Sequence, residues 1–274
     1  MDKIKILVAC HKPGSVHQDE VYSPIHVGRA VSTYKKEMAG MIGDDTGDNI
    51  SEKNPKYCEL TAQYWAWKNL KDVEYIGFCH YRRFFDIRTE DIERILQQKD
   101  AIVIKLLFDH PIWREITHFV TVEDMTIMLM VLKKKYPDYE ETLLRYLNGH
   151  TLYAKNMFIC KKALFDQYAE WLFDVLFECE KYINPSPYTR GQRVLAYMGE
   201  FLLPVYLMHH RFRVESAKYT DGHGHSKPHY GIKHKVAYNL VQWLTIRHRK
   251  KRLDDFYLQE VLVGFKNDGI IING

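Results

Sequence analysis

The sequence predicts an α/β protein in which helices flank a mostly parallel sheet. Short apolar runs of strand length recur along the chain, and helical patterns lie between them. Polar loops follow several of these runs directly. Strands that alternate with helices are typical of layered folds with a largely parallel sheet.

Four apolar runs are predicted as strands. The first, IKILVAC, is almost continuously apolar and leads straight into the polar loop HKPGSVHQDE. A run of this kind is typical of a strand that is buried on both faces of a parallel sheet. The four predicted strands are residues 4–10, 73–79, 101–105 and 152–160.

A helix is predicted from Asn54 to about Asn69. Asn54 is suited to the N-cap, and Pro55 is suited to the first turn because that turn needs no backbone N–H from it. Leu60 and Tyr64 then share one face of the helix, which we expect to pack in the core.

Three further helices are predicted downstream. Thr121 and Asp124 form a capping-box pattern ahead of an apolar periodic segment, and the stretch KKKYPD ends that helix. The other two helices cover residues 163–179 and 192–209, and Pro204 is expected to bend the second of them.

The charge distribution is uneven, although the net charge is only +4. Residues 222–253 contain eight Lys or Arg and no Asp or Glu, whereas the rest of the chain is mildly acidic. Inside this segment, Val236, Leu240 and Leu244 share one helical face between basic ends. The pattern indicates a helix that lies on an anionic surface such as a membrane leaflet. A solvated helix that packs on the domain is the alternative.

Features that the sequence lacks indicate the cellular compartment. No apolar run reaches the about 20 residues that cross a bilayer, and no cleavage-like site follows the charged start MDKIK. The five cysteines are scattered singly, without CxxC or metal-site spacing. We therefore expect a cytosolic protein with reduced, mostly buried thiols.

The segment YIGFCHYRRFFD places a histidine and two arginines at the end of a predicted strand. Ligands of open α/β sheets bind at the carboxyl ends of strands, where His80, Arg82 and Arg83 would lie. Arginine matches phosphate oxygens in a bidentate manner, so the two arginines could offset the two charges of a diphosphate. Surface salt bridges and a core histidine are the alternative interpretation. If the strand continued, alternation would send the two arginines to opposite faces, whereas a turn at His80 would remove that objection.

Longer motifs around this segment resemble a known family. GDDTGDNIS (43–51), NPKYCELTAQYWAWKN (54–69) and YIGFCHYRRFF (75–85) are similar, in this order, to motifs of bacterial glycosyltransferases from capsular and exopolysaccharide gene clusters. NMFI (156–159) and RVLAYMGE (193–200) are similar to downstream motifs of the same family, so the resemblance covers about residues 4–210. The family was long catalogued as a domain of unknown function and includes galactofuranosyltransferases.

The resemblance implies a GT-A-like fold and a nucleotide-sugar donor. In most GT-A enzymes an Asp-x-Asp motif at the end of a central strand holds a divalent metal, and the metal binds the donor diphosphate. The matching stretch here reads HYRR, which implies that His80, Arg82 and Arg83 replace the metal in catalysis by stabilising the leaving nucleoside diphosphate. The expected enzyme is a UDP-sugar-dependent hexosyltransferase without metal or other cofactor. Galactofuranose is the first candidate for the sugar, and galactose is the second.

Further donor-binding residues are expected in the loops near the first two strands. His11 and Lys12 follow the first strand, where GT-A proteins place the nucleotide. The loop DDTGDN supplies oxygen acceptors for the uracil, the ribose or the sugar, although an Asx-rich turn explains the same residue types. This loop is also the best alternative metal site. Besides the two arginines, the candidate donor-binding residues are His11, Lys12, Asp44, Asp45, Asn49 and Asn54.

The predicted helix 192–209 carries a polar stripe. Arg193, Tyr197 and Glu200 are spaced i, i+4 and i+7, so they share one face of a largely apolar helix. If this face lines the cleft, Glu200 is a candidate general base, and Arg193 and Tyr197 are candidates for binding the acceptor. A stripe that simply faces water is the alternative.

Other residues are candidates for the same tasks. Asp109 or Glu115 could serve as the base instead, and the sequence leaves open whether the anomeric centre is inverted. Asn156, which opens the NMFI motif, is a further candidate for acceptor binding.

We therefore expect a catalytic domain over residues 1–210 and a basic helical extension over residues 211–274. The expected partners are a UDP-sugar, a lipid-linked oligosaccharide acceptor and an anionic membrane surface, without nucleic acid. The protein would then be peripheral on the inner face of the cytoplasmic membrane. Two other classes stay open: a catalytically inactive nucleotide-sugar-binding scaffold, and a binder of anionic lipid or nucleic acid that acts through residues 222–253.

Overall fold

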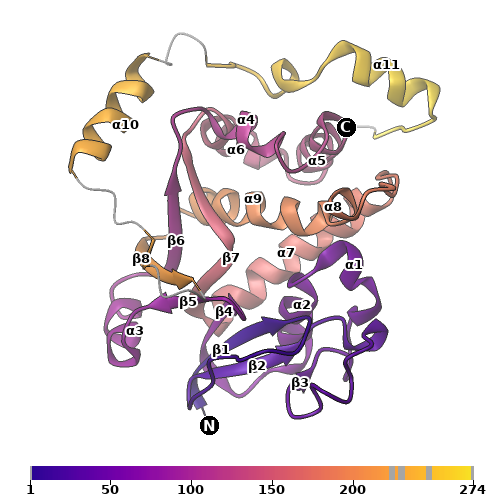
Figure 1. The fold of residues 1–274 in the computed structure, drawn as a ribbon. Coiled ribbons are helices and arrows are strands. Elements are labelled where there is room, and N and C mark those ends of the chain that lie inside the picture. Colours follow the sequence, from indigo (N-terminus) through magenta and orange to yellow (C-terminus); the bar gives the residue numbers. More distant parts are fainter. Residues whose placement is uncertain (1, 222–225, 228–231, 245–248, 273–274) are drawn as a thin grey trace. The chain divides into compact units, whose positions relative to one another are not determined.

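The computed structural model describes residues 2–221, 226–227, 232–244 and 249–272 (Figure 1). The chain divides into two compact units that interleave along the sequence. Unit 1 comprises Met1–Lys105, Tyr153–Trp171 and Arg211–His229, and unit 2 comprises Leu106–Leu152, Leu172–His210 and Tyr230–Gly274. The domain boundary predicted at residue 210 stays a prediction. Each unit is built from several separate stretches of the chain rather than from one consecutive half.

A parallel set of strands forms one part of the sheet in unit 1. Its order is β3 (Ile42–Gly43), β2 (Tyr22–His26), β1 (Asp2–Cys10) and β4 (Val73–His80). All neighbours in this set pair in parallel, and Ala9 of β1 lies opposite His80 of β4. The carboxyl ends of β1 and β4 therefore meet at one edge.

The remaining strands make the sheet mixed rather than mostly parallel. Beyond β4 the order continues with β5 (Arg83–Asp86), β8 (Val214–Asp221), β6 (Ala101–Leu107) and β7 (Thr151–Lys161). β5 pairs antiparallel with β4 and β8, β6 pairs parallel with β8, and β7 pairs antiparallel with β4. Because β7 pairs with both β6 and β4, these five strands close on themselves in a barrel-like arrangement. β9 (Ser226–Lys227) pairs antiparallel with β8.

The prediction of a mostly parallel sheet is thus wrong for the second part, and one reason is local. A two-residue turn at Tyr81 and Arg82 connects β4 to β5. Such a short connection allows only antiparallel pairing, because parallel neighbours need a crossover of a dozen or more residues.

The helices lie between the strands and after them. They are α1 (Asn54–Tyr57), α2 (Leu60–Asn69), α3 (Thr89–Leu96), α4 (Ile112–Ile116), α5 (Val122–Lys135), α6 (Glu140–Leu147), α7 (Lys162–Glu180), α8 (Thr189–Gln192), α9 (Val194–His209), α10 (Ile232–Leu244) and α11 (Gln259–Asn267). Short 3₁₀ turns occur at Arg29–Val31, Ser51–Lys53, Pro137–Tyr139 and Leu253–Phe256.

Most element predictions are confirmed. All four predicted strands are present, and Thr121 caps α5 by accepting a hydrogen bond from the Asp124 backbone N–H. The predicted helix from Asn54 is instead broken at Cys58, whose φ of 47° ends α1. Asn54 is also not the N-cap, a position that Lys53 occupies. The stretch after residue 210, expected to be a helical extension, contains the strand β8 before the helices α10 and α11.

The core of unit 1 holds the carboxyl ends of β1 and β4 in place. Ile6 and Val8 of β1 are completely buried. The rings of Phe78, Phe158 and Phe165 pack against one another where β4, β7 and α7 meet. A core of this density resists distortion, so the loops at this edge start from a rigid base.

All five cysteines are free, and Cys58 alone among them is not buried. Burial raises the pKa of Cys10 to about 12, so this thiol stays protonated. Among the described residues, no helix is both long and apolar enough to pass through a bilayer.

Candidate functional site

The β4–β5 hairpin carries the histidine and the two arginines that the sequence singles out. His80 ends β4 and lies directly opposite Arg83, the first residue of β5. The Tyr81 backbone N–H donates to the Ala9 carbonyl oxygen at 3.2 Å, which ties the turn to the end of β1. The hairpin therefore lies at the carboxyl ends of β1 and β4, where α/β folds bind ligands.

The turn between β4 and β5 determines on which side of the hairpin the two arginines lie. Residues directly opposite in an antiparallel pair have side chains on the same face, so Arg83 shares a face with His80. Arg82 lies in the turn, is exposed, and has its guanidinium 4.9 Å from the centre of the Tyr81 ring. Strand alternation no longer separates the two arginines, because the strand ends before Arg82.

His80 is neutral at pH 7 and hydrogen-bonded to β7. Its Nε2 lies 2.6 Å from the Lys155 carbonyl oxygen, which can only accept, so this nitrogen carries the hydrogen. Burial lowers the pKa of His80, and the nearby Arg83 guanidinium acts in the same direction, whereas the Glu59 carboxylate opposes it. Positive charge at the hairpin therefore comes from the arginines and not from the histidine.

Glu59 is a site residue that the sequence reasoning missed. Its Oε1 accepts a 2.7 Å hydrogen bond from the Asn156 side-chain amide. Asn156 is only 2% exposed and Glu59 is half-buried, so their contact is partly buried. The one available signal was the position of Glu59 within the long motif NPKYCELTAQYWAWKN. Asn156, predicted to bind the acceptor, here positions Glu59 next to His80.

The backbone of β7 is unusual at this point. Lys155 and Asn156 both adopt positive φ, 69° and 52° respectively. This conformation is uncommon for side chains other than glycine and clusters at functional sites. It directs the Lys155 carbonyl toward His80 and the Asn156 amide toward Glu59, so the strain serves two contacts of the site.

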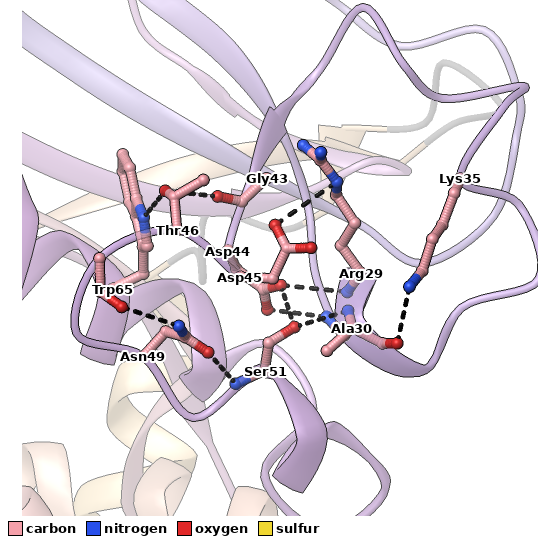
Figure 2. Close-up of polar contacts among 12 residues, drawn as sticks. Arg29, Ala30, Lys35, Gly43, Asp44, Asp45, Thr46, Asn49, Ser51 and Trp65 are labelled. Carbon is pink, nitrogen blue, oxygen red and sulfur yellow. Dashed lines mark hydrogen bonds and ion pairs between the residues drawn. The ribbon is translucent and has the colours of Figure 1, made fainter.

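Asp44 holds the loop that follows β3 (Figure 2). Its carboxylate accepts four hydrogen bonds, from the backbone N–H groups of Gly28 and Arg29 and from the hydroxyls of Ser51 and Thr61. The side chain is completely buried. All four donors are internal, so the contacts support a role in ordering the loop.

The other predicted residues of this loop also make internal contacts (Figure 2). Asp45 is half-buried and pairs with the Arg29 Nε at 3.4 Å. Asn49 donates to the Gly47 carbonyl and accepts from the Ser51 N–H, the contacts of an Asx-type turn. The predicted alternative explanation for this loop therefore accounts for Asn49.

Asn54 stabilises the break between α1 and α2. Its amide donates to the Cys58 carbonyl at 2.8 Å and to the Thr61 hydroxyl at 3.2 Å. Gly28, with φ of 67°, lies so close that an added Cβ would be 2.5 Å from Asn54. Only glycine fits there, so the motif from Asn54 packs closely against the turn after β2.

Two predicted residues lie at the end of β1. His11 is exposed, and its ring packs edge-on against the Tyr81 ring, with the centroids 5.3 Å apart. Lys12 is half-buried. The structure thus brings His11 to the β4–β5 hairpin through Tyr81.

The polar stripe of α9 belongs to unit 2. Arg193, which precedes the first helical residue, is exposed and lies with its guanidinium 5.6 Å from the Tyr197 ring centre. Tyr197 contacts the ring of Phe119, and Glu200 is half-buried. The roles predicted for these residues in acceptor binding and proton abstraction stay predictions.

The alternative base Glu115 is also in unit 2. It is 8% exposed and lies within hydrogen-bond range of His110. Asp109 contacts the same histidine from the other side and is itself exposed. Neither carboxylate is isolated, and their shared contact with His110 is not visible from sequence spacing.

In unit 1 the arrangement suits the binding of an anionic group at the end of β4. We define the hairpin site as Glu59, His80, Arg82, Arg83 and Asn156. Arg82 and Arg83 supply fixed positive charge, and guanidinium groups bind phosphate oxygens through paired N–H donors. The neutral His80 and the Glu59–Asn156 pair hold the base of the hairpin. The fold and site define an α/β protein with a hairpin that carries two arginines at the carboxyl ends of β1 and β4.

The chain belongs to the family described as domain of unknown function DUF4422, whose model matches residues 5–211. This confirms the family resemblance seen in the sequence motifs. No curated protein matches the chain.

A solved structure, described as the apo structure of the bifunctional glycosyltransferase WbbM, is similar to this chain. The TM-score is 0.73 and the sequence identity is 27%, over 84% of this chain and 47% of that one. This chain therefore spans about half the length of the protein it matches. The family match and the structural match together support assignment to a glycosyltransferase family.

Proposed function

We propose that the protein is a glycosyltransferase that transfers a sugar from a UDP-linked donor to a hydroxyl of a lipid-linked capsular, exopolysaccharide or O-antigen glycan. The observation that carries the proposal is the pair of arginines on a tight hairpin at the carboxyl ends of β1 and β4. The similarity to WbbM supports the reaction class. Galactofuranose is the first candidate for the sugar, and galactose is the second.

The proposed chemistry is electrostatic. Negative charge grows on the diphosphate as the bond to the sugar breaks, and preorganised cations stabilise that charge. Arg82 and Arg83 supply these cations, so the diphosphate needs no metal ion in this proposal. His80, being neutral, acts by positioning Arg83 and the β7 backbone.

An acceptor hydroxyl must also lose its proton during transfer. Glu200, Asp109 and Glu115 are the candidates for this step from the sequence, and Glu59 joins them because it lies beside His80 in the hairpin site. Arg193 and Tyr197 are proposed to bind the acceptor.

A thermal-shift panel of nucleotides and nucleotide sugars tests the donor proposal. We expect UDP and UDP-sugars to raise the melting temperature, and purine nucleotides to raise it much less. The shift should be the same in EDTA and in manganese, because the arginines rather than a metal bind the diphosphate. Each shift is measured against the ligand-free protein in the same buffer, so an effect of chelator on the protein alone cancels.

The outcomes separate the competing classes. A shift without sugar transfer or donor hydrolysis would indicate a nucleotide-sugar-binding scaffold. If UDP raises the melting temperature only in the presence of manganese, the diphosphate would be bound through a metal ion at an acidic cluster instead of by the arginines. No shift with any nucleotide would contradict the donor proposal.

Membrane association is proposed through α10. Four large apolar residues of this helix are exposed, namely Val236 at 62%, Leu240 at 55%, Trp243 at 68% and Leu244 at 56%. They follow one another at spacings of four, three and one residues, so they form one face. The sequence around them is rich in Lys and Arg, which attract anionic lipid headgroups. The proposed location is the inner face of the cytoplasmic membrane.

Vesicle binding tests this surface. The double variant Leu240→Ser/Trp243→Ser is expected to weaken binding to phosphatidylglycerol vesicles by at least about tenfold, because two exposed apolar anchors are removed. The matched control is Val263→Ser/Ile271→Ser, which removes two exposed apolar residues elsewhere. Equal loss in both variants, or undiminished binding in the α10 variant, would contradict the role of α10. Binding to DNA or RNA that competes with vesicles would favour the nucleic-acid class instead.

A further inference from the structure

A cluster of two histidines and a glutamate lies in unit 2 and takes no part in the hairpin site. His110 Nε2 and His118 Nδ1 lie 2.9 Å and 3.3 Å from the same oxygen of Glu115, Oε2. The three ligand atoms are all within 4.8 Å of one another. We propose that His110, Glu115 and His118 bind a divalent transition-metal ion, with zinc as the first candidate.

The environment of His110 favours a cation. Its Nδ1 lies 2.8 Å from the Asp109 Oδ1, and its Nε2 faces Glu115, so both ring nitrogens face carboxylate oxygens. A neutral imidazole has one N–H and one lone pair, and a lone pair that faces a carboxylate is repelled. A metal ion bound to Nε2 and to the Glu115 oxygen removes this conflict, while Nδ1–H still donates to Asp109.

The two spacings between the histidine nitrogens and Glu115 Oε2 fit a small ion, and the two nitrogens lie within 4.8 Å of each other. Zinc binds histidine nitrogens and carboxylate oxygens at about 2.0–2.2 Å in tetrahedral geometry, which places ligand atoms about 3.3 Å apart. The two distances to Glu115 Oε2 are close to this value. Two histidines and one carboxylate form a common ligand set for zinc and for other divalent first-row metals.

Other contacts order the ligands before any ion binds. The Phe108 N–H donates to the His150 carbonyl, and the Ile112 N–H donates to the Gly149 carbonyl, so the loop that carries His110 is held at both ends. The His118 N–H in turn donates to the Glu115 carbonyl. Asp109, bonded to the outer nitrogen of His110, has the position from which carboxylates orient metal-binding histidines.

The exposure of the ligands suggests how the remaining position is filled. The side chain of Glu115 is 11% exposed and that of His110 is 23% exposed, whereas that of His118 is 62% exposed. An ion held by these three residues would therefore face solvent on one side, and water can complete its coordination. Three protein ligands with one open position is the arrangement of an accessible zinc site.

Zinc binding is tested on the untagged protein after treatment with EDTA and desalting. Isothermal titration with zinc chloride is expected to show one site, and zinc is expected to raise the melting temperature. His118→Ala should abolish both effects without unfolding the protein, because this side chain is mostly exposed. Asp109→Asn should weaken zinc binding about 10- to 100-fold, as expected for the partner of a metal-binding histidine.

The control variant is His17→Ala. His17 is an exposed histidine that also contacts a carboxylate, Asp19, at 3.0 Å. It lies in unit 1, outside the cluster, so its removal should leave zinc affinity unchanged. Cobalt substitution adds a spectroscopic readout, since visible absorption bands of tetrahedral cobalt should appear in the wild-type protein and vanish in His118→Ala.

Two results would overturn the proposal. One is the absence of zinc binding in the wild-type protein. The other is zinc binding that His118→Ala leaves intact, which would show attachment elsewhere. Either result would leave the cluster as a hydrogen-bonded group without a metal ion. The proposal does not depend on the donor site, because the readouts are metal affinity and absorption rather than sugar transfer.

Discussion

Arg82→Ala and Arg83→Ala are each expected to lower kcat/KM for sugar transfer by about 10²- to 10³-fold, the loss typical when one preorganised transition-state donor is removed. The two guanidinium groups lie on the β4–β5 hairpin at the end of β4, where the leaving diphosphate is proposed to bind. The charge that they stabilise is larger in the transition state than in the bound donor. The loss should therefore appear mainly in kcat and less in KM.

Lysine variants separate charge from geometry. Arg83→Lys keeps the positive charge but loses the paired N–H donors, so it should recover only part of the activity. Arg94→Ala serves as a control, because Arg94 is an exposed arginine of α3 that pairs with Asp91. Melting temperatures within a few degrees of wild type would show that the variants fold. Near-normal turnover in both alanine variants would contradict the proposal that the hairpin arginines stabilise the leaving diphosphate.

Asp44→Ala is expected to destabilise the protein by about 3–5 kcal/mol, because it leaves several buried donors without an acceptor. The lost partners are the N–H groups of Gly28 and Arg29 and the hydroxyls of Ser51 and Thr61. A single buried carboxylate thus joins the turn after β2, the loop after β3 and the start of α2. Chemical denaturation followed by far-UV circular dichroism measures the change in the free energy of unfolding.

Asp45→Ala is the matched control for Asp44. Asp45 is the next residue and has an ion pair with Arg29, whose side chain is 36% exposed. Loss of a partly exposed pair of this kind should cost at most about 1 kcal/mol. Equal effects of the two substitutions would contradict the structural role of Asp44. If the Asp44→Ala protein is stable but UDP no longer raises its melting temperature, the result would instead support the predicted contact between Asp44 and the donor.

Much of the local structure could be predicted from the residues themselves. The buried strands are continuous apolar runs, and burial of such runs does not depend on which strand pairs with which. The Thr121 cap is a contact between residues three positions apart, so its spacing is readable in the sequence. The hairpin arginines were identified because they follow directly after an apolar strand.

The errors arise where a distant contact decides the outcome. Residues 214–221 form β8 because they pair with the edges of β5 and β6. The sequence of this polar segment does not indicate those partners. The break at Cys58 is stabilised by the Asn54 amide, which bonds to the Cys58 carbonyl instead of capping a longer helix. The direction of pairing around β4 was set partly by a local turn and partly by the distant return of β7.

The roles of individual side chains followed the same rule. Spacing and residue type were enough to propose a cationic group at the end of β4, because the strand and the HYRR motif are consecutive. They were not enough to show that Asp44 is buried among four donors, that Asn156 binds Glu59, or that one Glu115 oxygen lies between two histidines. Local structure depends on residues that are neighbours in the sequence, so it can be predicted from their pattern. The surroundings of a polar side chain depend instead on which remote segments fold against it.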